Sequence, residues 1–262
     1  MSLTQRHLKD LRALRYKKYR LLQDRYMVEG ARLVGEALQS TRTIEQVLAS
    51  NHFIKSDLWP AIRTTIVDRQ LTASTITDDQ AMQLSSTQHP QGIFAVLKLP
   101  RSIDDPAGTL QPPVLILDDI ADPGNLGTLL RTADWFAVPT VWVSPGSADI
   151  FNPKVLRSGM GAHFHIPALV QGDHETLAAQ ISKEKITLVG AVMDGKLLQH
   201  IRPPAERWAL AVGSEARGLS AFWRSKLDAV ATIPGYGEAE SLNAAVAAGI
   251  ILHYLCIQCR PA

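Results

Sequence analysis

The second half of this chain repeats one pattern, in which a continuous run of apolar residues is followed by a stretch with helical spacing. Strands that are apolar throughout, rather than at alternate positions, are buried on both faces. When helices separate such strands along the chain, the strands form a parallel sheet with helices on both sides. The expected strands are 114–117, 140–143, 164–167, 186–192, 208–212 and 229–233, and the expected helices are 126–136, 153–160, 175–183 and 241–256. The pattern therefore predicts an α/β fold that binds ligands beyond the carboxyl ends of its strands.

The first hundred residues predict a smaller α/β domain. Its expected helices are 4–20, 28–40, 57–62 and 78–84, and its expected strands are 44–49, 64–67 and 93–99. The segment 100–113 contains four prolines and few large apolar residues, a composition typical of linkers. We therefore expect a domain over 1–99, a linker over 100–113 and a second domain over 114–262.

Composition excludes several classes of protein. Of the 262 residues, 46% are hydrophobic and 20% are charged, as in soluble globular proteins. No apolar run approaches the ~18 residues that a membrane-spanning helix needs, and the N-terminus lacks the apolar core of a secretory signal. The only cysteines, Cys256 and Cys259, form too small a set for a zinc site. We expect a cytoplasmic protein with free thiols, no metal and no membrane partner.

The charge is unevenly distributed. The first 25 residues contain eight lysines and arginines against two aspartates, although the whole chain has a net charge of only +2. Such a basic segment indicates a polyanionic partner. The alternative is a solvated helix face, because Leu8, Leu11 and Leu14 give the same segment an apolar stripe.

Polar residues follow the first expected strand of the second domain. Asn125 lies in a glycine-containing loop, and Arg131 lies on the helix that comes next. An arginine at this place is suited to clamp a phosphate or a carboxylate. The two residues are six apart, so they can converge only if Asn125 precedes the helix.

Two further loops come later in the chain. The loop 213–219, GSEARGL, follows an apolar strand and places Glu215 among small residues. In the stretch 233–253, we expect Ser241 to cap a buried helix. The side-chain amide of Asn243, in the first turn of that helix, needs hydrogen-bond partners or a ligand. The alternative for this stretch alone is a capped core helix without a ligand.

Together these loops resemble the motifs of the SpoU/TrmH family of RNA ribose 2′-O-methyltransferases, in the SPOUT superfamily. The first motif is N-L-G-x-x-x-R-T-A over 125–133, the second is G-S-E-A-R-G-L over 213–219, and the third is I-P-G-Y-G-x-x-x-S-L-N over 233–243. The first hundred residues resemble the ribosomal-protein-like RNA-binding domain that precedes many of these enzymes, through 17–34 and 89–96.

The resemblance implies a fold and a set of ligands. The parallel sheet would end in a deep trefoil knot whose loops bind S-adenosylmethionine, and two copies would pair through the knot region as a homodimer. By residue-to-residue match, the cofactor would contact Gly213, Ile233, Gly235, Gly237 and Leu242. The catalytic residues would be Asn125, Arg131, Glu215, Ser241 and Asn243. In this scheme Arg131 clamps the RNA phosphate and stabilises the ribose oxygen, Glu215, Ser241 and Asn243 orient Arg131 and the ribose, and Asn125 supports its loop.

The resemblance also implies an RNA substrate. The candidates for RNA contact are Arg12, Arg15, Lys17, Lys18 and Arg20, and Tyr16, Tyr19 and Tyr26 are placed either to stack on bases or to pack in the core. We expect ribose 2′-O-methylation of large-subunit (23S) ribosomal RNA. The alternatives are a transfer RNA 2′-O-methyltransferase, a base methyltransferase of the same superfamily and a non-catalytic RNA-binding protein on the same fold.

Overall fold

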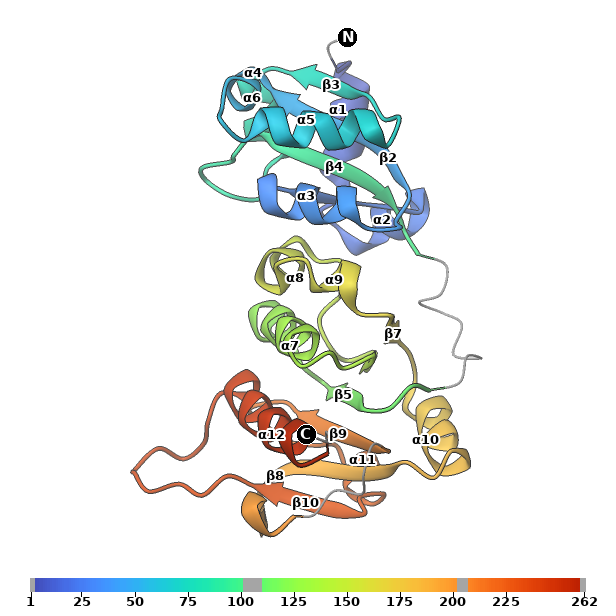
Figure 1. Cartoon of the computed structure of the whole chain (residues 1–262), viewed down its shortest axis with the longest axis vertical. Helices are drawn as coiled ribbons and strands as arrows, with labels where there is room; N and C mark the ends of the chain where they lie inside the picture. The colour runs from blue at the N-terminus through green and yellow to red at the C-terminus, as the bar shows by residue number, and fades with distance from the viewer. Residues whose placement is uncertain (1–2, 101–109, 202–206, 260–262) are drawn as a thin grey trace. The chain divides into compact units, whose positions relative to one another are not determined.

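A computed structural model describes residues 3–100, 110–201 and 207–259 (Figure 1). The chain packs into two compact units: Met1–Pro100 with Phe151–Phe164, and Arg101–Ile150 with His165–Ala262. Most of the expected linker lies outside the described residues. The segment Phe151–Phe164, which we expected in the second domain, packs with the first unit.

The first unit is built on a four-stranded sheet with the order β1-β4-β2-β3. Strand β4 (Ile93–Lys98) pairs antiparallel with β1 (Arg25–Glu29) and β2 (Ile44–Ser50), and β2 pairs parallel with β3 (Ala73–Ile76). The helices of this unit are α1 (Gln5–Ala13), α2 (Lys17–Gln23), α3 (Ala31–Gln39), α4 (Asn51–Ile54), α5 (Trp59–Asp68), α6 (Asp78–Leu84) and α8 (Pro153–Gly159), and α9 (Ala162–His165) ends at its boundary.

The leucine stripe at the N-terminus is part of the core of this unit. Leu8, Leu11 and Leu14 are buried against Leu48 and Phe94 of the sheet. Burial of side chains of this size contributes roughly 1.5–3 kcal/mol each. Helix α1 is therefore a structural element of the unit, and its basic residues occupy its other face.

Three expected elements of the first unit were wrong. The helix expected over 4–20 is two helices, α1 and α2, and the helix expected from 28 begins only at Ala31, after Gly30 at a φ of +95°. The strand expected over 64–67 lies inside α5. There the hydroxyls of Thr64 and Thr65 donate to the carbonyls four residues earlier, which satisfies these β-branched residues within a helix.

Two of the arginines expected to contact RNA have structural partners instead. The guanidinium of Arg20 is buried, with 3% of the residue exposed, and its Nη1 donates to the carbonyls of Leu14 and Arg15 at 2.8 Å each. The Nη2 of Arg15 donates to the carbonyl of Gln83 at 2.6 Å and to that of Ser85, and burial lowers the pKa of Arg15. Arg20 is therefore withdrawn from the RNA-facing set, and Arg15 joins α1 to the end of α6.

The second unit contains the expected parallel sheet. Its six strands have the order β10-β8-β9-β5-β6-β7, and every neighbouring pair is parallel. The strands are β5 (Val114–Asp118), β6 (Thr140–Val143), β7 (Ala168–Gln171), β8 (Thr187–Leu197), β9 (Trp208–Gly213) and β10 (Ala229–Thr232). The helices are α7 (Pro123–Trp135), α10 (His174–Lys183), α11 (Ala221–Arg224) and α12 (Ala244–Cys259), with a short 3₁₀ helix, η2 (Leu198–His200). The α/β class is confirmed; the knot remains a prediction.

Alternate residues of the strands pack on different helices. Val114 and Ile116 of β5 belong to one core cluster with Leu177 of α10 and Trp223 of α11. Side chains alternate between the two faces of a strand, so the buried residues between them face the other side, where α12 packs against α7 (Figure 1). The sheet thus has one face covered by α10 and α11 and one covered by α7 and α12.

The start of one strand in this half of the chain also differs from expectation. The strand expected over 164–167 begins at Ala168, because α9 occupies the preceding residues. His165 of α9 pairs with Asp134 of α7, with Nδ1 and Oδ2 2.9 Å apart. Among the described residues no helix is long and apolar enough to cross a membrane, and none of their His, Cys, Asp and Glu side chains form a group of three or more that could hold a metal.

Candidate active site

Three side chains from separate parts of the chain meet at the N-terminal ends of α7 and α12. Asn125 Nδ2 donates to Glu215 Oε1 at 2.8 Å, and Asn243 Nδ2 donates to Asn125 Oδ1 at 3.0 Å and also to Glu215 Oε1. The backbone N–H of Ala244 donates to the same Glu215 oxygen at 3.2 Å. Glu215 Oε1 therefore accepts three hydrogen bonds, and we call Asn125, Glu215 and Asn243 the amide–carboxylate cluster.

The orientation of Asn243 follows from its position at the start of α12. Its Oδ1 accepts from the backbone N–H groups of Ala245 at 3.0 Å and Val246 at 3.4 Å, so Asn243 is the N-cap of this helix. Its Nδ2 must then point away from the helix, toward Glu215. We expected Ser241 to be the cap, which was wrong, because the helix begins at Ala244 and Ser241 is exposed.

Arg131 lies apart from this cluster in the isolated chain. Helix α7 begins at Pro123 with Asp122 as its N-cap, so Asn125 is inside the helix and does not precede it. Residues six apart on a helix lie on different faces, roughly 9 Å apart along the axis. The side chain of Arg131 is exposed and makes no hydrogen bond or ion pair within the described part of the chain. Of the five residues proposed for catalysis, the structure brings three together and leaves Arg131 and Ser241 outside.

The glycines proposed for cofactor binding differ in what they contact. A Cβ on Gly213 would lie 2.1 Å from the carbonyl carbon of Gly218, so the loop Gly213–Leu219 itself requires a glycine there. Gly235 and Gly237 have open space around the position of a Cβ, which leaves their backbone accessible to a ligand. Near them, Ile233 is partly exposed and Leu242 is exposed.

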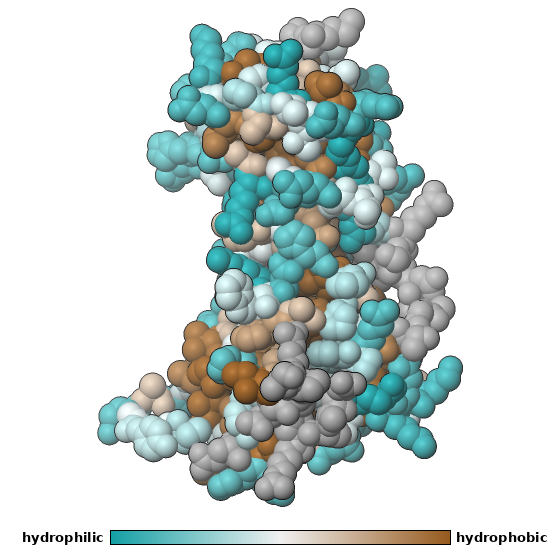
Figure 2. Space-filling view, in the orientation of Figure 1, coloured by the Kyte–Doolittle hydropathy of each residue, from teal (hydrophilic) through white to brown (hydrophobic). Residues whose placement is uncertain are grey.

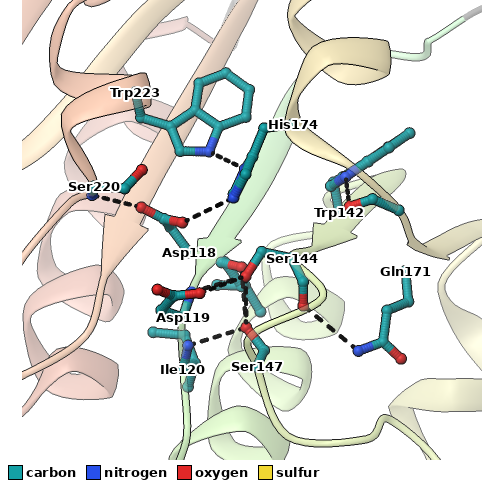
Figure 3. Close-up of polar contacts among 12 residues, drawn as sticks. Asp118, Asp119, Ile120, Trp142, Ser144, Ser147, Gln171, His174, Ser220 and Trp223 are labelled. Atoms are coloured by element: carbon teal, nitrogen blue, oxygen red, sulfur yellow. Dashed lines mark hydrogen bonds and ion pairs between the residues drawn. The ribbon is translucent and has the colours of Figure 1, made fainter.

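Hydrogen bonds from the β6–α8 loop hold the start of the first loop. The backbone N–H of Asp119, which has a φ of +56°, donates to Ser144 Oγ at 2.9 Å, and that of Ile120 donates to Ser147 Oγ at 3.0 Å (Figure 3). Asp122 then caps α7 by accepting from the N–H of Asn125 at 2.8 Å. The path from β5 to Asn125 is therefore fixed by side chains from two loops.

A second polar network lies under the loop Gly213–Leu219, and we did not anticipate it from the sequence. Asp118 is completely buried, and its Oδ2 accepts from the backbone N–H of Ser220 at 2.7 Å. Its Oδ1 lies 3.6 Å from Nε2 of His174, and His174 Nδ1 accepts from the indole N–H of Trp223 at 2.8 Å (Figure 3). Because an indole nitrogen only donates, neutral His174 carries its proton on Nε2, toward Asp118.

This network holds the loop that carries Glu215. Asp118 is the register partner of Gly213 in the sheet, and it accepts the hydrogen bond from Ser220 just beyond the loop. Within the loop the N–H of Gly218 donates to the carbonyl of Ser214 at 2.8 Å. Asp118 thus contacts both ends of a loop that is also closed by its own backbone.

We predict that the network is energetically coupled. In Asp118→Asn the amide oxygen is needed to accept from Ser220, so the amide nitrogen faces His174 Nε2, and no neutral tautomer of His174 then suits both this donor and the indole of Trp223. Each of Asp118→Asn and Trp223→Phe should lower the free energy of unfolding by about 1–2 kcal/mol. The double variant frees His174 to change tautomer, so it should lose less than the sum of the two, as measured by urea denaturation. Additive losses would contradict the coupling.

Comparison with known proteins identifies the family. Residues 112–253 match the SpoU rRNA Methylase family, and residues 5–95 match the MRM3-like substrate binding domain. The chain is 36% identical over 250 residues to the 23S rRNA (guanosine(2553)-2′-O)-methyltransferase RlmP of Bacillus subtilis (strain 168), covering 95% of each chain.

Solved structures agree in fold over nearly the whole length. The SpoU methyltransferase AviRb from Streptomyces viridochromogenes, in complex with AdoMet, has a TM-score of 0.84 and 25% identity, with 98% of each chain covered. The AdoMet-bound rRNA methyltransferase from Sinorhizobium meliloti has a TM-score of 0.83 and 25% identity, with 97% of each chain covered. The family match, the near full-length relative and the meeting of one residue from each of the three motifs lead to one conclusion: the chain belongs to the SpoU rRNA Methylase family.

Proposed function

We propose that this protein transfers a methyl group from S-adenosylmethionine to a ribose 2′-hydroxyl of large-subunit ribosomal RNA. The observation that carries the proposal is the amide–carboxylate cluster, in which one residue from each of the three motifs meets the other two. The names of the relatives support the reaction, because RlmP is named as a 23S rRNA 2′-O-methyltransferase and the AviRb structure contains AdoMet. A cytoplasmic location stays a prediction.

The residues around the cluster suit the cofactor. S-adenosylmethionine supplies a methyl group that its sulfonium makes electrophilic. The open backbone at Gly235 and Gly237 leaves room for close approach, and Ile233 and Leu242 offer apolar surface for an adenosine. Gly213 would then contribute by keeping the loop closed beside the cofactor. These roles remain proposals.

The proposed role of Arg131 is electrostatic. A guanidinium keeps its proton near neutral pH, so it is a poor general base. We assign Arg131 to the RNA phosphate next to the target ribose, where its charge also stabilises the oxygen that attacks the methyl group. Its exposed position without a partner within the described part of the chain leaves it available for this contact. The amide–carboxylate cluster holds the N-terminal ends of α7 and α12 together, and Arg131 lies further along α7.

Mapping the methylated product tests the function. The protein is incubated with radiolabelled S-adenosylmethionine and ribosomal RNA from a strain that lacks the gene, and the RNA is hydrolysed with alkali. A ribose 2′-O-methyl group blocks cleavage, so the label should appear in an alkali-resistant dinucleotide. Label on a base would instead indicate a base methyltransferase. In a parallel incubation with transfer RNA, label in that RNA alone would indicate that transfer RNA is the substrate. If no methyl group is transferred to either RNA, the alternative of a non-catalytic RNA-binding protein would be favoured.

We also propose that the protein forms a homodimer through α12. Val246, Ile250, His253 and Ile257 are exposed at spacings of four, three and four, so they form one stripe along the helix. Figure 2 shows hydrophobic residues gathered over this helix. Trp135, at the end of the neighbouring α7, is 84% exposed. An apolar surface of this kind is typical of an interface with a second copy.

Light scattering tests the dimer. Val246→Glu with Ile250→Glu places two charges on the exposed stripe and removes no core side chain, so we expect a shift from the mass of two chains to the mass of one. Val67→Glu is the control, because Val67 is an exposed residue of α5, outside the stripe. A dimer that survives the double substitution would exclude this face as the interface.

A further inference from the structure

Helix α2 has an unusual way of attaching to the first unit. Among its seven residues, only Arg20 is buried. The helix is held by the two hydrogen bonds from Arg20 to carbonyls at the end of α1, and by Gln23 Nε2, which donates to the carbonyl of Asp10 at 3.4 Å. Because these anchors are polar, the apolar side chains of the helix are not needed to attach it.

Those apolar side chains face outward. Tyr16, just before the helix, is 66% exposed and Tyr19 is 39% exposed, whereas Tyr26 is 1% exposed. Leu21 and Leu22 are also exposed. The rings of Tyr16 and Tyr19 meet edge to face, with centroids 6.4 Å apart and planes at 63°. In an edge-to-face pair the edge of one ring lies against one face of the other, so this contact leaves at least one face of each ring uncovered by its partner.

The charges around this pair are almost all of one sign. Lys17 and Lys18 of α2 are exposed between the two tyrosines, and Arg6, Lys9 and Arg12 are exposed on α1. Asp10 is the only acidic residue within these two helices. Aromatic rings interleaved with cations are the two components of a surface that binds single-stranded nucleic acid, through bases and phosphates respectively.

We propose that Tyr16 and Tyr19 form a stacking surface for unpaired bases of the RNA substrate, with Lys17 and Lys18 on the flanking phosphates. The proposal rests on the proposed function only for the identity of the ligand as RNA. It assigns the recognition of unpaired RNA to α2 in particular. A duplex hides the faces of its bases, so this surface should discriminate against one.

Removing the whole N-terminal segment would not test the proposal, because Leu8, Leu11 and Leu14 are core residues. Point substitutions in the full-length protein do test it. RNA affinity is measured by fluorescence anisotropy without S-adenosylmethionine. The probes are a labelled single-stranded oligouridine and a labelled RNA duplex of the same length. Tyr16→Ala with Tyr19→Ala should weaken single-strand binding by about tenfold for each stacked base, leave duplex binding unchanged and leave the salt dependence unchanged.

Three matched controls separate stacking from charge, from a general surface effect and from loss of the tyrosine hydroxyls. Lys17→Gln with Lys18→Gln should weaken binding of both probes and reduce the slope of log affinity against log salt by about 1.4, or 0.7 for each single-strand phosphate contact. Leu58→Ala with Met82→Ala removes two exposed apolar side chains elsewhere in the unit and should change nothing. Tyr16→Phe with Tyr19→Phe should retain single-strand binding, since stacking needs only the rings.

Wild-type affinity of the double alanine variant for the single strand would overturn the proposal, as would an equal loss on the duplex. Either result would favour a protein partner, rather than unpaired bases, as the ligand of the two tyrosines. Failure here is distinct from failure of the proposed function, because binding is measured without methyl transfer. A protein that binds the oligouridine through these tyrosines but methylates no ribose would contradict the proposed function alone.

Discussion

Arg131→Ala should lower the turnover of methyl transfer by about 1,000-fold and leave the affinity for S-adenosylmethionine unchanged. Removal of one preorganised group that stabilises a developing oxyanion costs about 100- to 1,000-fold, and Arg131 is also assigned to hold the phosphate. Arg131 is exposed on α7 and has no partner within the described residues, so its loss should not unfold the protein. Single-turnover rates and calorimetric binding of the cofactor measure the two quantities.

Arg131→Lys distinguishes charge from shape. Lysine keeps the positive charge but lacks the planar fork that engages two phosphate oxygens, so we expect an intermediate loss of about 100-fold. Lys183→Ala is the control for removing one surface cation, because Lys183 is exposed on α10, on the other side of the sheet. Near-wild-type turnover by Arg131→Lys would contradict the clamp.

Asn243→Asp should lower methyl transfer by about 100-fold while α12 still forms. Aspartate is as good an N-cap as asparagine, so the helix should begin at the same residue. The carboxylate, however, replaces the Nδ2 that donates to Glu215 and Asn125, and two like charges then lie within hydrogen-bonding distance. Loss of two hydrogen bonds, one of them to a charged group, is consistent with this rate. Circular dichroism and the labelled-cofactor assay follow helix and activity.

The repulsion can be removed without restoring the original residue. Glu215→Gln in the Asn243→Asp background replaces one of the two carboxylates by an amide, so thermal stability should return toward that of the wild type. Methyl transfer should stay low, since the two remaining donors, Asn125 Nδ2 and the N–H of Ala244, no longer face a carboxylate. Wild-type activity of Asn243→Asp alone would show that the cluster is not required.

Local signals in the sequence predicted the bounds of an element correctly where residues within or next to that element fix its ends. Helix α6 has the predicted bounds, because Thr77 and Gln80 form a capping box at its start. Strand β6 also has the predicted bounds, since all its residues are apolar or buried and a turn precedes it. The resemblance to the SpoU/TrmH motifs supplied the site residues, and the structure brought Asn125, Glu215 and Asn243 together.

The features that were missed depend on residues far apart in the chain. The start of α12 is set by Asn243, whose amide is oriented by Glu215, 28 residues earlier, and by Asn125, 118 residues earlier. The partners of Asp118 are likewise distant, with Ser220 separated from it by 102 positions. Nothing in the local pattern of a strand end distinguishes a buried aspartate that binds another loop from an exposed one. Such contacts depend on the order of the strands in the sheet, and local sequence patterns do not predict that order.

The closed loop beneath Glu215 has a consequence for the energetics of binding. Gly213 and Gly218 are in contact, Ser214 and Gly218 are bridged, and Asp118 holds the residue that follows. This turn is therefore closed by contacts within the chain before a ligand binds, so ordering it on association should cost little conformational entropy. The affinity measured for the cofactor should accordingly include little cost from ordering the loop Gly213–Leu219.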